Sequence, residues 1–293
     1  MVLVDAPEAE RIEASIMAEE VMGGGSAANT AVIARRMGAS VAYLGKVASD
    51  DAGIGYANEL RSQGINYASQ PVEDSPTPTA RCIILVTPDG QRTMHTFLGV
   101  STEFSVNDLD TALIASSSIV YMEGYLFDKA PAQDAFVQAA SMAHEAGRKV
   151  AVTLSDAFCV NRHRDAFLAL IRGHIDIVFA NEAEICALYQ TSDFDHAIAQ
   201  VAEDTALTVV TRAENGAVIV EGKNVTVVPT ASVNVVDSTG AGDAFAGGFL
   251  ALYARNQPLV ACAKAGNQAA SSVITRMGAR PDASFPNFAM AEC

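Results

Sequence analysis

Short apolar runs alternate with segments of helical periodicity along most of this chain. The runs have the length of buried strands, and the segments between them repeat their apolar residues at helical spacing. The predicted strands are Val41–Leu44, Ile119–Met122, Val150–Leu154, Ile175–Ala180 and Leu207–Thr211, and the predicted helices are Ala27–Met37, Ile54–Gln63, Pro131–Ala146, Arg162–Arg172 and Gly242–Arg255. Such alternation predicts an α/β fold with a mostly parallel central sheet covered by helices on both faces.

The segment from about residue 68 to residue 99 departs from this pattern. It is rich in threonine and interrupted by proline, and Pro88-Asp89-Gly90 is a turn signal between two strands. We therefore predict a β-hairpin that lies against the main sheet as a small flap. No repeat and no clear linker divides the chain, so residues 1–293 are interpreted as one domain.

The chain carries 19 Lys and Arg against 34 Asp and Glu residues, which gives a formal net charge of −15. This excess of acids repels nucleic-acid backbones and anionic membrane surfaces, so neither is an expected partner. An anionic small ligand remains open, because a local group of backbone N–H donors can hold a phosphate at any net charge. The sequence shows no leader, no apolar run of about 18 residues and no CxxC pair among its five cysteines, which predicts a soluble cytoplasmic protein.

Ligands of open α/β sheets gather where strands end, so residues that follow predicted strands are the first candidates for a site. Asn234–Val236 is interpreted as a strand end and Ala244–Ala254 as a helix, with Gly240-Ala241-Gly242 in the turn between them. Three consecutive N–H groups at the positive end of a helix can hold a phosphoryl group or an oxyanion. Asp243 would then lie beside that group, although it could equally cap the helix.

Two further stretches have similar alternatives. A glycine run that includes Gly24 and Gly25 leads into a helix, and Asn29 offers a donor and an acceptor to hydroxyl groups, or is purely structural. Asn181 and Glu184 follow another predicted strand, where they could order a hydrated Mg²⁺ or form a helix cap. On spacing alone the cap is favoured.

Common nucleotide and metal fingerprints are missing. The sequence has no GxxxxGKS or GxxxxGKT motif, and Phe245 stands where GxGxxG would need its last glycine. None of the five histidines has a metal-site spacing such as HExxH. Neither a P-loop, a dinucleotide site nor a histidine metal site is predicted.

Taken together, these stretches resemble the PfkB carbohydrate kinase family, which includes ribokinase-like sugar kinases and adenosine kinase-like nucleoside kinases. The resemblance covers nearly the whole chain and rests on Gly23–Gly53, Asn181–Glu184 and Asp237–Phe249. It implies a ribokinase-like three-layer α/β/α fold with a small β lid, formed by the flap.

The resemblance also implies roles for residues. Asp243 would be the catalytic base that takes the proton of a primary hydroxyl as it attacks the γ-phosphate of ATP, and Gly240, Ala241 and Gly242 would form the anion hole. The implied acceptor positions are Gly24, Gly25, Asn29 and Glu123, with Arg81 and Phe97 from the flap. The implied ATP positions are Asn181, Thr211, Gly216 and Asn267. Glu184 would hold Mg²⁺ through water, and Asp237 and Thr239, with the Gly278 region, match a site for a monovalent cation such as K⁺.

Two departures from the family pattern stand out. The family opens with a strand that carries an acceptor-binding Asp, whereas only about twenty residues precede the glycine run here, so that strand is expected to be missing. The T-x-G pattern after the nucleotide strand reads Thr211-Arg212-Ala213, which puts close backbone approach to ATP in question there.

The acceptor is less sharply indicated than the reaction. Tyr121–Asp128 and Leu154–Arg164 look closer to adenosine kinase-like members, and the alternatives are a sugar kinase for ribose, fructose or 2-keto-3-deoxygluconate, or a non-catalytic ligand-binding relative. The flap is expected to close over the acceptor and exclude water. In relatives such flaps pair, so a homodimer through the lid is a further expectation.

Overall fold

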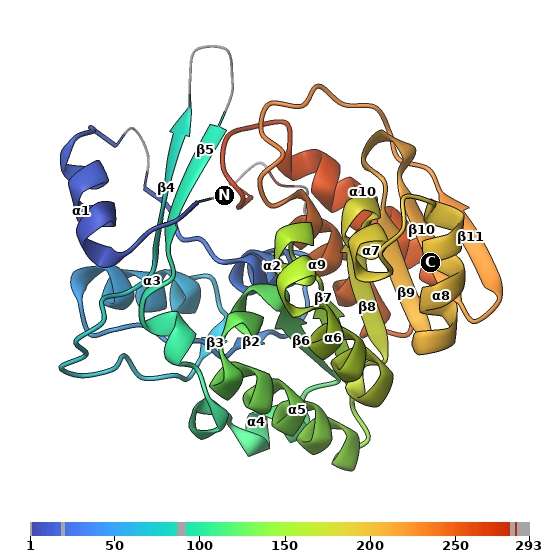
Figure 1. Cartoon of the computed structure of the whole chain (residues 1–293), viewed down its shortest axis with the longest axis horizontal. Helices are drawn as coiled ribbons and strands as arrows, with labels where there is room; N and C mark the ends of the chain where they lie inside the picture. Colours follow the sequence, from blue (N-terminus) through green and yellow to red (C-terminus); the bar gives the residue numbers. More distant parts are fainter. Residues whose placement is uncertain (1, 19–20, 87–91, 282–284, 286–293) are drawn as a thin grey trace.

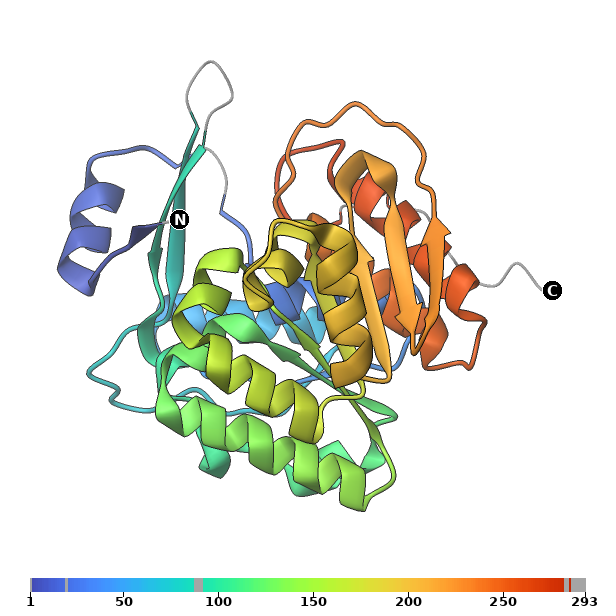
Figure 2. The same cartoon turned by 45° about the vertical axis from the view of Figure 1, so that its right-hand side comes forward.

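The computed structural model describes residues 2–18, 21–86, 92–281 and 285, and its main body has three layers (Figure 1, Figure 2). The middle layer is a sheet of β6 (Ile119–Glu123), β7 (Lys149–Thr153), β8 (Ile177–Asn181), β9 (Leu207–Thr211), β10 (Ala217–Glu221) and β11 (Asn224–Val228). Their spatial order is β11-β10-β9-β8-β7-β6. Strands β6 to β9 run parallel, and β10 and β11 continue the sheet antiparallel.

Helices cover both faces of this sheet. One face carries α4 (Thr111–Ser116), α5 (Ala130–Glu145), α6 (Ala157–His174), α7 (Glu182–Leu188) and α8 (Phe194–Asp204). The other face carries α9 (Ala241–Tyr253) and α10 (Leu259–Val273). Helix α2 (Ser26–Arg36) packs on α9, and α3 (Asp51–Ser62) packs on α2. Successive strand residues point to opposite faces, so Val150 and Val152 pack with Phe136, whereas Ala151 packs with Phe249. The predicted three-layer α/β/α fold is confirmed.

A lid stands beside the main body (Figure 1). Its sheet consists of the antiparallel hairpin β4 (Arg81–Val86) and β5 (Arg92–Phe97), with β1 (Val2–Leu3) parallel to β5. Helix α1 (Ala6–Ala14) packs on one face of this sheet. The hairpin predicted from the sequence is therefore present, and its predicted turn, Pro88-Asp89-Gly90, lies outside the described residues.

Smaller elements complete the fold outside the two larger sheets. Strands β2 (Ala42–Tyr43) and β3 (Asn66–Tyr67) form a parallel pair. The short 3-10 helices are η1 (Gly99–Glu103), η2 (Val106–Asp108), η3 (Gly124–Asp128) and η4 (Ala213–Asn215).

The predicted strand end at Asn234–Val236 was wrong. These residues lie in a loop without strand pairing, and Val235 and Val236 are 56% and 47% exposed. The N–H groups of Val236 and Asp237 both donate to the carbonyl of Ile274, which fastens the loop to the segment after α10. A short pair of valines has strand propensity, but here no neighbouring strand pairs with it.

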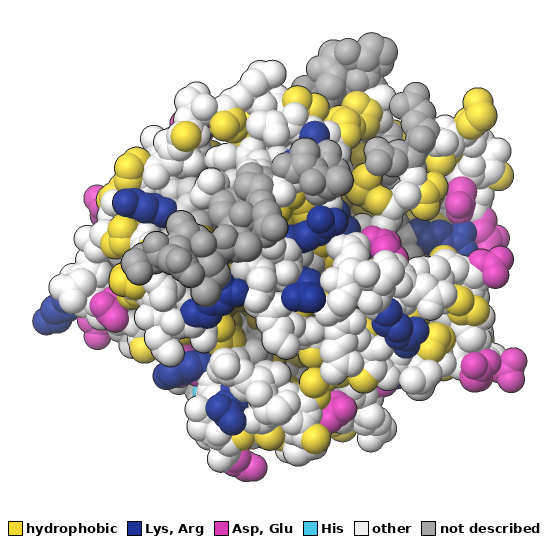
Figure 3. All heavy atoms as spheres, turned by 180° about the vertical axis from the view of Figure 1, so that it is seen from behind, with side chains coloured by type: hydrophobic (Ala, Val, Ile, Leu, Met, Phe, Trp, Pro, Cys, Tyr) yellow, Lys and Arg dark blue, Asp and Glu magenta, His cyan; other side chains and the backbone are white. Residues whose placement is uncertain are grey.

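The distribution of surface charge and the length of the helices are relevant to binding of nucleic acids and membranes. On the face seen in Figure 3, basic side chains are spread out, and acidic side chains lie among and around them. Every helix among the described residues is too short or too polar to cross a membrane.

Candidate active site

A cleft with a volume of about 2700 Å³ separates the lid from the carboxyl ends of the parallel strands. Glu123, Thr153, Asn181 and Thr211 end β6 to β9 and all line it. The glycine run before α2 and the first turn of α9 line it as well. The topology therefore brings the three stretches selected from the sequence to one edge of the sheet, where open α/β sheets bind ligands.

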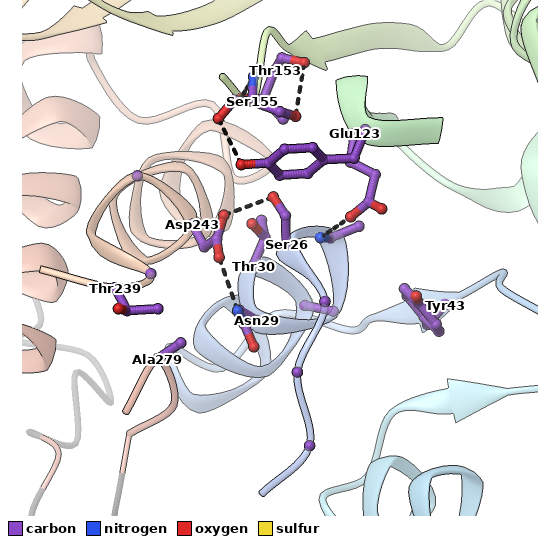
Figure 4. Close-up of a pocket in the computed structure, with 18 of the residues that line it drawn as sticks. Ser26, Asn29, Thr30, Tyr43, Glu123, Thr153, Ser155, Thr239, Asp243 and Ala279 are labelled. Atoms are coloured by element: carbon purple, nitrogen blue, oxygen red, sulfur yellow. Dashed lines mark hydrogen bonds between the residues drawn. The ribbon is translucent and has the colours of Figure 1, made fainter. Parts of the chain in front are cut away.

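Asp243 lies in the first turn of α9, and its carboxylate points toward the first turn of the neighbouring helix α2 (Figure 4). Ser26 Oγ donates to Oδ1 at 2.7 Å, and Asn29 Nδ2 donates to Oδ2 at 2.9 Å. Burial raises the pKa of Asp243, while these two hydrogen bonds act in the opposite direction. The N-cap of α9 is Gly240, without a side-chain cap, so Asp243 does not serve as the helix cap.

The turn before Asp243 needs glycine at one position and leaves space at another. Gly240 has φ of +77°, and a Cβ there would lie 2.7 Å from the Cβ of Ala279. A Cβ at Gly242 would meet no atom within 4 Å. The first-turn N–H groups of Gly242 and Asp243 have no partner within the helix, and both residues line the cleft.

The predicted anion hole of three N–H groups needs one correction. The N–H of Ala241 donates to the carbonyl of Ser238 at 3.2 Å, which closes the turn. The N–H of Ala241 is therefore not available to an anion, because the tight turn uses it for its own hydrogen bond. The donors that remain in the first turn of α9 are the N–H groups of Gly242 and Asp243.

On the acceptor side, the glycine run places α2 against β6. Gly25 is the N-cap of α2 with φ of +90°, and Gly24 presents its carbonyl to the hydroxyl of Tyr56 at 3.2 Å. Glu123 Oε2 accepts the N–H of Ala27 at 2.6 Å. Burial, together with the charge of Asp243, raises the pKa of Glu123 to about 7.

Asn181 and Glu184 form the helix cap that spacing favoured. Asn181 Oδ1 accepts the N–H of Glu184 at 2.8 Å, and Glu184 Oε2 accepts the N–H of Asn181 at 3.0 Å, so the pair is a reciprocal capping box for α7. Both also line the cleft. Burial raises the pKa of Glu184 to about 7, with a contribution from the charges of Asp156 and Asp243.

The predicted nucleotide positions lie around the ends of β9 and β11. Thr211 and Gly216 line the cleft, and a Cβ at Gly216 would lie 2.2 Å from the carbonyl of Val228. Asn267 Nδ2 donates to the carbonyls of Val228 and Pro229, both at 3.2 Å, and so fixes the start of the loop that leads to Asp237.

The departure at Thr211-Arg212-Ala213 has a structural counterpart. Ala213 has φ of +47°, the left-handed region that glycine adopts more easily. The backbone thus keeps a glycine-like conformation despite the alanine.

Asp237 is buried and holds two segments together. Its Oδ1 accepts the N–H of Thr239 at 2.8 Å, and its Oδ2 accepts the N–H of Gly278 at 2.9 Å. The carboxylate therefore connects the turn before α9 with the segment after α10. In the described part of the chain, no group of three or more His, Cys, Asp or Glu residues is arranged to hold a metal ion.

The two lid positions differ in their surroundings. Arg81 Nη1 forms an ion pair with Glu13 of α1 at 2.7 Å, which commits part of its guanidinium to the helix that packs on the lid. Phe97 ends β5, is half-buried and lines the cleft.

Three residues near the site were missed from the sequence. Ser26 contacts the carboxylate of Asp243, and the small residues around it gave no separate signal. Ser155 follows β7 with φ of +67°, and its hydroxyl accepts the N–H of Gly124 at 2.8 Å. Arg280 reaches Asn29 from the far end of the chain, a contact that no local pattern predicts.

The comparison with known proteins agrees with this geometry. The model of the pfkB family carbohydrate kinases matches residues 10–285. The chain belongs to this family. It is therefore a phosphotransferase with an alcohol group as acceptor, and its fold is ribokinase-like.

Individual relatives match over most of their length. The crystal structure of adenosine kinase from Sinorhizobium meliloti superposes with a TM-score of 0.93 at 44% identity, and covers 97% of this chain and 88% of that one. A probable sugar kinase from Rhizobium etli has a TM-score of 0.93 at 42% identity, with 97% and 87% covered. Adenosine kinase from Dictyostelium discoideum is 29% identical over 91% of this chain and 83% of its own.

Proposed function

We propose that the protein is an ATP-dependent, adenosine kinase-like nucleoside kinase that phosphorylates a primary hydroxyl of its acceptor. One observation carries the proposal: the partly buried carboxylate of Asp243 lies in the open first turn of α9, in a large cleft. A base for the acceptor proton and donors for a phosphoryl group thus come from the same helical turn.

Asp243 would act as the general base. Its two donors, Ser26 and Asn29, hold each carboxylate oxygen and favour the ionised form against the effect of burial. The ionised carboxylate can accept the proton of an acceptor hydroxyl placed within hydrogen-bond distance of it. That transfer frees the oxygen to form the new bond to the γ-phosphorus, while the bond from this phosphorus to the bridging oxygen breaks and ADP would leave.

The first turn of α9 would hold the transferring group. The N–H groups of Gly242 and Asp243 and the positive end of the helix dipole favour an anion at this position. ATP, when bound, supplies the γ-phosphoryl group, and Mg²⁺ neutralises part of its charge. Mg²⁺ prefers few carboxylates and several waters, so the single carboxylate of Glu184 fits a role through water. Thr211, Gly216, Asn181 and Asn267 would line the nucleotide side.

A nucleoside is favoured as the acceptor by the adenosine kinases among the relatives. Tyr43 and Tyr56 also line the cleft on the acceptor side, with ring centres 6.4 Å apart, and offer an aromatic surface to a base. A free sugar is the second candidate, supported by the probable sugar kinase among the similar structures. The ionisable base beside helix donors argues against a non-catalytic binding protein, which would need no base.

Three finer predictions remain. A K⁺ ion at Asp237 and Thr239 and a cytoplasmic location stay predictions. A homodimer through the lid also stays a prediction. The surface of the lid available to a second copy is restricted, because α1 packs on one face of the lid sheet and lid side chains such as Ile84 line the cleft. The edge of β4 is the part of the hairpin that a second copy could pair with.

The proposal is tested by ADP release from MgATP with adenosine, inosine, guanosine, ribose, fructose and 2-keto-3-deoxygluconate as acceptors. We expect turnover with a nucleoside, and a loss of about 10²–10⁴-fold in Asp243→Asn, the usual contribution of a general base. Asp195→Asn, on the exposed surface of α8, serves as the matched control. Undiminished transfer in Asp243→Asn would refute the role of the base, and turnover with free sugars alone would replace the nucleoside.

A further inference from the structure

Arg280 lies behind the acceptor side of the cleft, in the segment that follows α10. Its side chain is 7% exposed. Nη2 donates to the carbonyl of Gly24 at 3.0 Å, and Nη1 forms an ion pair with Glu59 of α3. The guanidinium carbon lies 5.6 Å from the ring centre of Tyr56. The side chain is therefore held by the glycine run and by α3 in a single position.

The remaining nitrogen of Arg280 contacts Asn29. Nε donates to Asn29 Oδ1 at 3.1 Å, while Nδ2 of the same amide donates to Asp243 Oδ2 at 2.9 Å. A guanidinium can only donate, and an ionised carboxylate can only accept. One orientation of the amide satisfies both neighbours, and the flipped orientation satisfies neither.

We propose that Arg280 is a positioning residue for phosphoryl transfer, which holds the Asn29 amide with its NH₂ group toward Asp243. The inference rests on the proposed function, because it assigns Arg280 a role through the proposed base. Without the arginine the amide is free to turn once Asp243 is protonated, and its oxygen can then accept a hydrogen bond from the carboxyl group. The protonated form of Asp243 would gain a partner that the fixed amide denies it, so the pKa of Asp243 would rise.

The segment that carries Arg280 also supports the other side of the base. The N–H of Gly278 donates to Asp237, and Ala279 lies where a Cβ at Gly240 would clash. Three consecutive residues thus contact the turn before α9 and the amide opposite it. The first turn of α9 and the partner of its aspartate are positioned by one piece of chain.

The test is the pH dependence of kcat/KM with MgATP and the acceptor that gives turnover. Arg280→Met removes all donors, and Arg280→Lys keeps the positive charge for Glu59 but lacks the Nε donor. One additional hydrogen bond to the protonated form corresponds to about 0.5–1 unit of pKa, so the acid limb should move to higher pH by about that much in both variants. Arg36→Lys, at the exposed end of α2, is the control and should leave the limb unchanged.

Other titratable groups face Asp243 and are common to all variants. They are Glu123, Glu184, Tyr121 and Tyr125, whose pKa values are each raised in part by the charge of Asp243. Because they remain in every variant, the difference between the limbs reports on the altered donor.

A double-mutant cycle with Asn29→Ala completes the test. In that background there is no amide to orient, so Arg280→Lys should not move the limb further. The inference is overturned if Arg280→Lys leaves the limb at the wild-type pH, or if it moves the limb equally with and without Asn29. Undiminished transfer in Asp243→Asn would instead refute the proposed role of Asp243 as the base, and absence of transfer to every acceptor would refute the proposed function, so these failures are distinct.

Discussion

At the scale of single residues, the cleft brings three carboxylates together. Glu123, Glu184 and Asp243 end or begin elements at the same edge of the sheet, and burial raises the pKa of each. Each charge also raises the cost of ionising its neighbours. The fold therefore carries an electrostatic cost at this cleft, which a bound cation or a hydrogen-bonded acceptor would reduce.

This cost makes the stability of the protein depend on pH. The pKa of Glu123 is about 7 in the folded state against 4.5 for an ordinary glutamate, so between these values the folded protein binds a proton that the unfolded chain releases. The free energy of unfolding therefore falls as pH rises through this window. Glu123→Gln, which carries no charge, should be more stable than the wild type by about 1–3 kcal/mol at pH 8.

Urea unfolding without ligands checks this prediction at pH 8 and at pH 5. The advantage of Glu123→Gln should shrink at pH 5, where the wild-type side chain is protonated in the folded state. Glu203→Gln, on the exposed surface of α8, is the control. An advantage that is absent at pH 8, or equal at both pH values, would contradict the link to Glu123.

Individual site residues were predicted from the sequence where a motif named them, and missed where only the fold supplies the partner. Asp243 and Asn29 were selected by their motifs, and they do meet in the cleft. The capping interaction of Asn181 followed from its spacing to Glu184. Ser26 and Arg280 were missed, because their contacts join segments that no local pattern connects.

At the scale of elements, the N-terminus of α9 is the most demanding part of the structure. Gly240 combines a positive φ with a close approach to Ala279, so Gly240→Ala should cost at least about 2 kcal/mol and abolish transfer. Gly242→Ala meets no atom and lies in a helix, so it should be stable to within about 1 kcal/mol.

The two alanine variants separate folding from function. If a phosphoryl group approaches the N–H of Gly242, Gly242→Ala should fold normally and still lose turnover. Thermal unfolding and ADP release on the same preparations give both answers. Equal destabilisation by the two substitutions would contradict the geometry of this turn.

Helices and strands were predicted well where the apolar periodicity is strong. They were predicted poorly where a strand depends on pairing with a neighbouring strand. Leu207–Thr211 was predicted with its observed bounds. Helix α6 begins at Ala157, before the predicted Arg162, and its backbone departs from helical geometry at His163. Asn234–Val236 was wrong because strand propensity cannot show whether a partner strand is present.

At the scale of the whole molecule, the lid and the main body face each other across the cleft. The natural chain has no tryptophan, so Ile84→Trp places a single reporter on the lid, at a position that is 40% exposed and lines the cleft. Closure of the lid over the acceptor should transfer the indole into a drier environment. Its fluorescence should then shift to shorter wavelength when nucleoside is added.

A second single-tryptophan variant provides the control. Val225 is exposed on β11, at the far edge of the sheet, and Val225→Trp should show no such shift. A spectrum of Ile84→Trp that stays unchanged at saturating nucleoside would argue against closure.

The layered architecture was the most predictable feature of the whole molecule. Alternating strands and helices leave few ways to bury apolar surface on both faces of a parallel sheet. The assembly of the site depends on more distant contacts, such as Asn29 with Asp243, and these follow from the fold as a whole.

The contact of Arg280 with Asn29 spans 251 positions, and that of Asn29 with Asp243 spans 214. Contacts this distant in sequence require the closure of very long loops, which costs chain entropy that local contacts do not cost. A partly folded chain can already contain the sheet and most helices while its base has neither its donor nor its orientation. Recovery of turnover during refolding should therefore measure completion of the fold, and compact but incompletely folded chains should show no turnover.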